Sequence, residues 1–168
     1  MNEAVAPPYP AKALANTLLD WAEARSSEIT PLKMQKLLFF MHADYLVKTG
    51  SPLVKEVFEA WSYGPVIPSV YEQFKQFSRL KITSKASVFN PRTRQATVPI
   101  LELPPAVHTE LSEIFLIYAD VDAGLLSSIS HRSGGPWDQA VKKFEAHQNI
   151  NRSIPNDLIC SAHRLASA

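Results

Sequence analysis

Histidine and cysteine are the side chains of this chain best suited to hold a metal ion. The sequence contains five histidines and one cysteine, and the one close pair among them is Cys160 and His163. Because zinc sites normally combine two clusters of such ligands, this single pair predicts no metal site. Asp120 and Asp122 look like the start of a calcium loop, but the loop's glycine and final glutamate are missing. We therefore expect Asp122 to cap a helix instead.

Hydroxyl side chains beside His131 come closest to the pattern of a nucleophilic site. Ser130 directly precedes His131, but a catalytic serine and its base must meet in space, which adjacency in sequence does not provide. The sequence holds no G-x-S-x-G elbow, and its five glycines form no phosphate-binding loop. These patterns predict a protein that is not an enzyme and needs no cofactor. Catalysis by His131, Ser130 and Cys160 is the alternative.

Positive charge gathers in one segment of the chain. Residues 73–101 contain no acidic side chain, and the basic residues of this segment are Lys75, Arg79, Lys81, Lys85, Arg92 and Arg94. Such a segment can contact an acidic protein surface or phosphate, and it can also be a solvated face. Aromatic side chains interleave poorly with the basic ones, so stacking on single-stranded nucleic acid has little support. Nucleic-acid binding is therefore not the expected function.

The elements that must position these residues are mostly helices. With 168 residues, 46% apolar content and 20% charged content, the chain is a typical globular protein. Residues 1–10 hold three prolines, so we expect a flexible lead-in before a single domain at 11–168. Helices are predicted over 11–25 and 31–48, from Pro105, from the Asp122 cap to Ser130, from Pro136 and after Pro155. Thr30 and Pro31 are a strong start for the second of these helices.

Two segments are expected to form β-structure. A short strand is predicted at 57–61, followed by a turn at Tyr63–Gly64–Pro65 and a helix that runs from an N-cap at Ser69 to Phe77. Residues 78–101 alternate loosely between apolar and polar types around the turn signal Asn90–Pro91, which predicts a hairpin. The strand at 57–61 can lie beside this hairpin. The predicted fold class is α+β, mostly α-helical, with a small antiparallel hairpin or three-stranded β element.

The segment 59–74 is unusually aromatic for a stretch that also contains two prolines and a glycine. We expect Trp61 and Phe74 to fill the core, with the hydroxyls of Tyr63 and Tyr71 at its rim. A partner-facing role is the alternative, because Tyr and Trp dominate the hot spots of protein interfaces.

His131 and Trp137 flank a Gly-Gly-Pro turn. Buried imidazole and indole N–H groups need hydrogen-bond partners, so we expect structural hydrogen bonds from both side chains.

Charge and hydropathy limit where the protein works. The net charge is +1, which favours no class of partner, and a single cysteine excludes an internal disulfide. The N-terminus lacks the pattern of a signal peptide, and the longest apolar run, residues 37–41, is far shorter than the roughly 20 residues of a membrane span. We expect a cytoplasmic protein with no membrane partner.

Four blocks occur in a telling order: ITPLKMQKLLFF at 29–40, TGSPLV at 49–54, EAWSYGPVIPSVYEQF at 59–74 and LSSISHRSGGPWDQA at 126–140. With these blocks the chain resembles the Panacea domain, the SocA-like antitoxin family that includes phage-associated proteins of the GepA type. The resemblance runs from about Ala11 to Ile159, and the block around Trp61, Gly64 and Pro65 is its most specific part. Met34 and Phe39 stand where the family more often has leucine and tyrosine.

The resemblance implies an antitoxin that neutralises a cognate toxin by direct protein contact, with the toxin encoded in the adjacent gene. One branch of the family is thought to act as an adaptor that delivers its toxin to a protease, so a cellular protease is the second partner implied. A regulatory or nucleic-acid-binding protein of a mobile element is a further alternative. No catalytic residue carries over from the family. We expect the partner surface in the segment from Arg79 to Arg94, together with Tyr63 and Tyr71.

Overall fold

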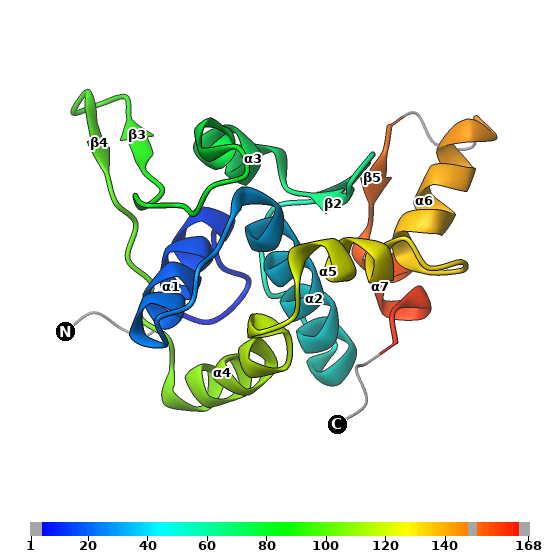
Figure 1. Ribbon diagram of the computed structural model, residues 1–168, viewed down its shortest axis with the longest axis horizontal. Helices are drawn as coiled ribbons and strands as arrows, with labels where there is room; N and C mark the ends of the chain where they lie inside the picture. Colours follow the sequence, from blue (N-terminus) through cyan, green and yellow to red (C-terminus); the bar gives the residue numbers. More distant parts are fainter. Residues whose placement is uncertain (1–4, 148–150, 165–168) are drawn as a thin grey trace.

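The computed structural model describes residues 5–147 and 151–164, and the described elements are mostly helices (Figure 1). In chain order they are α1 (Ala11–Ala24), α2 (Pro31–Thr49), β1 (Phe58–Trp61), β2 (Gly64–Val66), α3 (Pro68–Phe74), the 3-10 helix η1 (Lys75–Phe77), β3 (Val88–Asn90), β4 (Gln95–Thr97), α4 (Pro105–Ala119), α5 (Ala123–Ser130), α6 (Pro136–Glu145), β5 (Ser153–Ile154) and α7 (Asn156–Ala162). The predicted fold class, mostly helical α+β with small antiparallel β elements, is confirmed.

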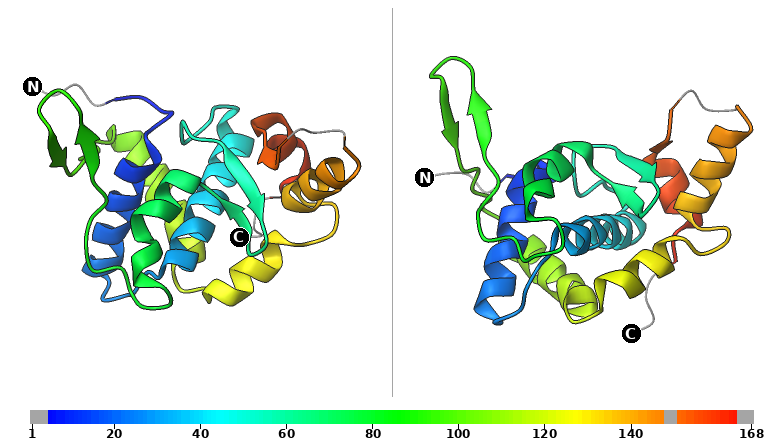
Figure 2. Two further views of the ribbon diagram at one scale, coloured as in Figure 1. Left: turned by 90° about the horizontal axis from the view of Figure 1, so that it is seen from above. Right: turned by 45° about the horizontal axis from the view of Figure 1, so that its top comes forward.

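Helix α2 runs through the middle of the molecule (Figure 2). The Thr30 hydroxyl accepts a hydrogen bond from the Lys33 backbone N–H, and Pro31 occupies the first turn, where its missing N–H costs nothing. Gly50 ends the helix in the left-handed conformation, with φ 72°. Residues 33–46 are all buried, because α2 contacts α1, α3, α4, α5, α7 and β2.

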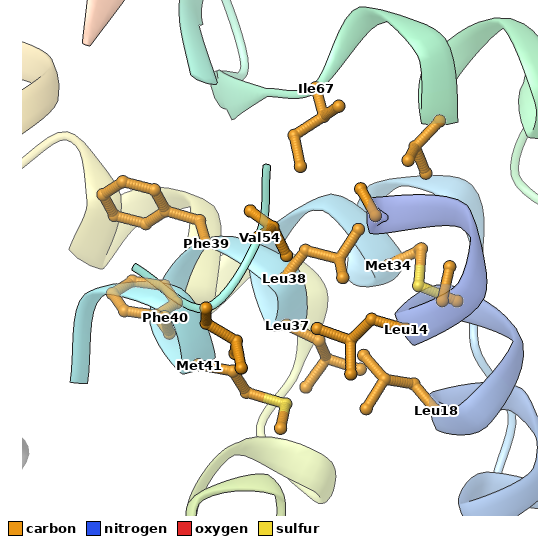
Figure 3. Close-up of a cluster of buried hydrophobic side chains, with 14 of the residues drawn as sticks. Leu14, Leu18, Met34, Leu37, Leu38, Phe39, Phe40, Met41, Val54 and Ile67 are labelled. Carbon is orange, nitrogen blue, oxygen red and sulfur yellow. The ribbon is translucent and has the colours of Figure 1, made fainter. Parts of the chain in front are cut away.

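The core is built on opposite sides of α2 (Figure 3). Leu14 and Leu18 of α1 face Leu37 on one side, whereas Phe39 and Phe40 point away toward the other. Burying a leucine or phenylalanine side chain stabilises a fold by about 1.5–3 kcal/mol. The apolar residues on most of the girth of α2 therefore account for its central place.

Strand β1 is the middle of a three-stranded antiparallel sheet with the order β2-β1-β5. Trp61 pairs with Gly64, so the chain reverses at Ser62 and Tyr63, and Gly64 and Pro65 belong to β2. The turn expected at Tyr63–Gly64–Pro65 is therefore placed one residue too late. Strand β5 was not predicted, because two residues carry too little pattern.

The β3–β4 hairpin is a separate sheet that projects from the helical body (Figures 1 and 2). All six of its strand residues are exposed. The expectation that the strand at 57–61 can lie beside it is wrong, since β1 pairs with β2 and β5 instead. The hairpin is also shorter than predicted, because Ile82 and Ala86 pack into the core from the loop before it.

Helix α3 differs from its expectation at both ends. Ile67, and not Ser69, is the N-cap, because Pro68 with its fixed φ opens the helix. The α-helix ends at Phe74 and continues as η1 to Phe77. The helices expected from Pro105, the Asp122 cap, Pro136 and Pro155 are all present.

The lead-in expected at residues 1–10 is anchored at its end. Tyr9 is fully buried, and its backbone pairs with Leu53 and Lys55 on the loop after α2. Residues 1–4 lie outside the described residues. In the part of the chain that the structure describes, no helix is both long and apolar enough to cross a membrane.

Candidate functional site

The polar side chains of α2 hold the surrounding backbone in place. The Lys33 amine donates hydrogen bonds to the carbonyls of Tyr118 and Val121 at the end of α4, the first at 2.9 Å. Burial lowers the pKa of Lys33, and the nearby Asp122 carboxylate opposes this shift. Gln35 makes a two-way contact with Ile67: its oxygen accepts from the backbone N–H at 2.9 Å, and its nitrogen donates to the carbonyl at 3.4 Å.

Lys36 is the most deeply buried charged side chain of this set. Its amine is fully buried and donates to the Pro65 carbonyl at 3.3 Å. Burial lowers the pKa of Lys36 to about 7. The sequence patterns predicted no role for these α2 residues. The one signal for their burial was their position within an otherwise apolar helix.

Three consecutive carbonyls in and beside the β1–β2 turn lie within hydrogen-bond distance of side chains from α5, α6 and the link between them. The Trp137 indole donates to the Trp61 carbonyl at 2.8 Å, and the Ser127 hydroxyl donates to the Tyr63 carbonyl at 3.0 Å. His131 Nε2 lies 3.1 Å from the Ser62 carbonyl, and its ring packs edge-on against Trp137 with 4.1 Å between centroids. This clamp fixes the turn on the helical body.

The clamped turn carries aromatic side chains toward solvent. Tyr63 is 75% exposed. Trp61 is only half-buried: its indole donates to Glu59 at 2.7 Å, and its ring meets Tyr71 edge-on at 5.0 Å. The expectation that Trp61 fills the core is therefore wrong, because its position on β1 lies on the solvent side of the sheet. Phe74 is buried as expected.

A surface groove of about 620 Å³ lies beside these rings, and we call it the aromatic groove. Its lining residues are Pro31, Leu32, Gln35, Trp61, Ser62, Tyr63, Val66, Tyr71, Ser78, Arg79 and Arg152. They come from the start of α2, the β1–β2 hairpin, α3, the turn after η1 and the approach to β5. The groove therefore depends on segments that only the folded chain brings together.

A strained turn holds Arg79 at the groove. The Leu80 N–H donates to the Phe77 carbonyl at 2.8 Å, and Ser78 has φ 53° and ψ −110°. These angles belong to the first central position of a type II′ turn, which glycine usually occupies. No side chain in residues 5–147 or 151–164 forms an ion pair or hydrogen bond with the Arg79 guanidinium.

The basic residues expected to form one partner surface lie in three places. Arg79 joins Tyr63 and Tyr71 at the groove. Lys81 pairs with Glu28 at 3.3 Å, and Lys85 pairs with Asp20 on α1. Arg92 and Arg94 lie exposed at the turn of the β3–β4 hairpin. Acidic residues that are distant in the sequence thus pair with two lysines of a segment that has no acidic residue of its own.

Most of the residues considered for metal binding and catalysis make structural contacts. His163 lies 2.6 Å from Asp44, which also accepts from the Tyr118 hydroxyl at 2.7 Å, and burial raises the pKa of Tyr118. Cys160 is exposed. Asp122 caps α5 by accepting from the backbone of Gly124 and Leu125. Within the described ranges, no three His, Cys, Asp or Glu side chains are grouped so that they could hold a metal ion.

Comparisons with known proteins place the chain in a family. No solved structure matches the chain. Antitoxin SocA of Caulobacter vibrioides is 39% identical over 131 residues, which cover 76% of this chain and 68% of that protein. Residues 34–138, which include most of the groove, match the family described as Antitoxin SocA-like, Panacea domain. The chain belongs to the SocA-like antitoxin family, characterised by the Panacea domain.

Proposed function

We propose that this protein is an antitoxin that neutralises a cognate toxin by direct protein–protein contact in the cytoplasm. Its similarity to Antitoxin SocA supports the antitoxin role. The observation that best supports direct contact is the aromatic groove, in which Tyr63, Tyr71 and Arg79 meet at the surface. Tyr, Trp and Arg are the residues that contribute most to hot spots in protein interfaces.

The way the groove is held also suits binding. The clamp from α5 and α6 fixes the β1–β2 turn, so the backbone that carries Trp61 and Tyr63 loses little conformational freedom when a partner docks. A preformed surface binds more tightly than one that must be ordered on contact. Arg92 and Arg94 on the projecting hairpin are a second candidate contact, and the two surfaces can be tested separately.

Co-expression with the product of the adjacent gene tests the function. We expect that product to stop growth when it is expressed alone, and this protein to restore growth and to co-purify with it. The proposal fails if the neighbouring product is harmless alone, or if it stays toxic in the presence of this protein.

The same strains separate neutralisation from the alternatives. Simple neutralisation leaves the half-life of the toxin unchanged or longer, whereas a proteolytic adaptor shortens it. Cys160→Ala, at an exposed position, is expected to protect as well as the wild type. Loss of protection with the fold intact would instead indicate catalysis. Binding to nucleic acid would be revealed by an affinity that falls steeply with added salt.

A further inference from the structure

We infer that the aromatic groove binds a short segment of the partner protein that carries a carboxylate side chain next to an apolar one. This inference rests on the proposed function, because it names the chemistry by which the toxin is recognised. It commits the groove to a protein segment, in preference to phosphate or a second copy of the chain.

The charge of the groove is one-sided. Among the described residues, its lining includes Arg79 and Arg152 and no acidic side chain. The Arg152 guanidinium lies 4.9 Å from the centre of the Phe144 ring, so an aromatic contact already supports it. Arg79, by contrast, is without an ionic partner among the described residues. Arginine binds carboxylates through two parallel hydrogen bonds, and this fork is unused at Arg79.

The backbone that presents Arg79 is strained. Ser78 adopts a positive φ that side chains rarely occupy, and it directly precedes the arginine. Such strain persists only where surrounding contacts enforce it, and it is concentrated at binding sites. The charge arrangement and the strained turn are independent observations, and both point to Arg79 as a ligand-binding side chain.

The rest of the groove lining favours an apolar side chain next to the carboxylate of the bound segment. Leu32, Val66 and the rings of Trp61 and Tyr71 give the groove a largely apolar lining. A volume of about 620 Å³ is within the usual range of small ligand sites and holds only a few side chains. A nucleic acid strand would need a longer row of basic side chains than Arg79 and Arg152, the two that line the groove among the described residues.

Two matched charge reversals test the inference on the complex with the adjacent gene product. Arg79→Glu and Lys55→Glu change the net charge equally, and both positions are exposed, but only Arg79 lines the groove. By isothermal titration calorimetry we expect Arg79→Glu to raise Kd at least about 30-fold and Lys55→Glu less than about 3-fold. Tyr63→Ala should raise Kd about 10-fold, whereas Leu80→Ala, also exposed but outside the groove, should not.

A charge exchange identifies the carboxylate. Acidic residues of the partner are replaced by lysine one at a time, and one replacement is expected to restore binding to Arg79→Glu while weakening binding to the wild type. Failure of every replacement to restore binding overturns the inference. So does an Arg79→Glu variant that binds as tightly as Lys55→Glu, although the proposed function then stands.

The other outcomes are also decisive. If Arg79→Glu converts a dimer of this chain to a monomer in sedimentation velocity, the groove holds a second copy and the inference is wrong. If the adjacent gene product forms no complex at all, the proposed function fails and the inference fails with it. Melting temperatures of all variants should match the wild type, because these side chains are exposed.

Discussion

The buried amine of Lys36 should cost the folded state stability at neutral pH, and Lys36→Met should remove that cost. Lys36 is fully buried, has no acidic partner within the described residues, and donates one hydrogen bond, to the Pro65 carbonyl. Burial lowers its pKa from 10.5 to about 7. Methionine has a similar length and carries no charge to desolvate.

The size of the effect follows from this pKa. Each unit by which folding lowers the pKa of a lysine costs about 1.4 kcal/mol while the unfolded chain stays protonated. At pH 7 the cost at Lys36 is therefore about 4 kcal/mol. Loss of the hydrogen bond to the Pro65 carbonyl offsets about 1–3 kcal/mol of the gain. We expect Lys36→Met to raise the free energy of unfolding at pH 7 by about 1–3 kcal/mol.

The pH dependence gives the sharper test. Between pH 7 and 10.5 the unfolded chain holds a proton on Lys36 that the folded chain has released, so stability of the wild type rises with pH in this window. Relative to Lys36→Met, the wild type should gain about 2 kcal/mol between pH 7 and pH 9. Below pH 7 both states are protonated, and the difference between the two proteins should level off.

Urea denaturation followed by circular dichroism at pH 5, 7, 8 and 9 measures this difference. Lys55→Met, at an exposed position, is the matched control and should run parallel to the wild type. A constant gap between wild type and Lys36→Met from pH 7 to 9 would refute the reasoning, since Lys36 would then keep its ordinary pKa. A loss of several kcal/mol in Lys36→Met at every pH would mean that the hydrogen bond outweighs desolvation.

Three further substitutions test the local geometry by the same denaturation assay. Gly64→Ala should lower the free energy of unfolding by about 2–4 kcal/mol, because φ is 105° and a Cβ would lie 2.4 Å from the Lys36 amine. Gly50→Ala, with φ 72° and open space around it, should lower it by only about 1 kcal/mol. Equal losses at the two glycines would contradict the close approach. Asp122→Ala should cost about 1 kcal/mol through loss of the α5 cap, and an unchanged midpoint would speak against that cap. Ser78→Gly should stabilise by about 0.5–1 kcal/mol, whereas a destabilised variant would show that the turn is not strained.

Much of the fold was predictable because its signals are local. Most prolines at first helical turns and the Asp122 cap set helix starts in the right places, and apolar residues on most of the girth of α2 are typical of a central helix. These signals act within about one helical turn, so neighbouring residues alone decide them. The family resemblance, carried by short motifs, was confirmed as well.

The candidate site was only partly visible in advance. Tyr63, Tyr71 and Arg79 were selected, but Arg79 was grouped with Lys81 and Lys85, whose partners on or just after α1 lie more than fifty residues earlier. Periodicity placed Trp61 in the core, although one face of β1 looks to solvent. A pattern of alternation gives two faces but does not say which of them the rest of the chain covers.

The sequence by itself determined the class of the fold, most of the helix starts and the family, because these depend on capping, proline geometry and short motifs. Tertiary structure alone decided that Lys33, Gln35 and Lys36 would hold distant backbone, and that a strained turn would bring Arg79 to the aromatic rings. Those outcomes depend on which segments pack against one another. Burial, charge pairing and pKa values all follow from that packing.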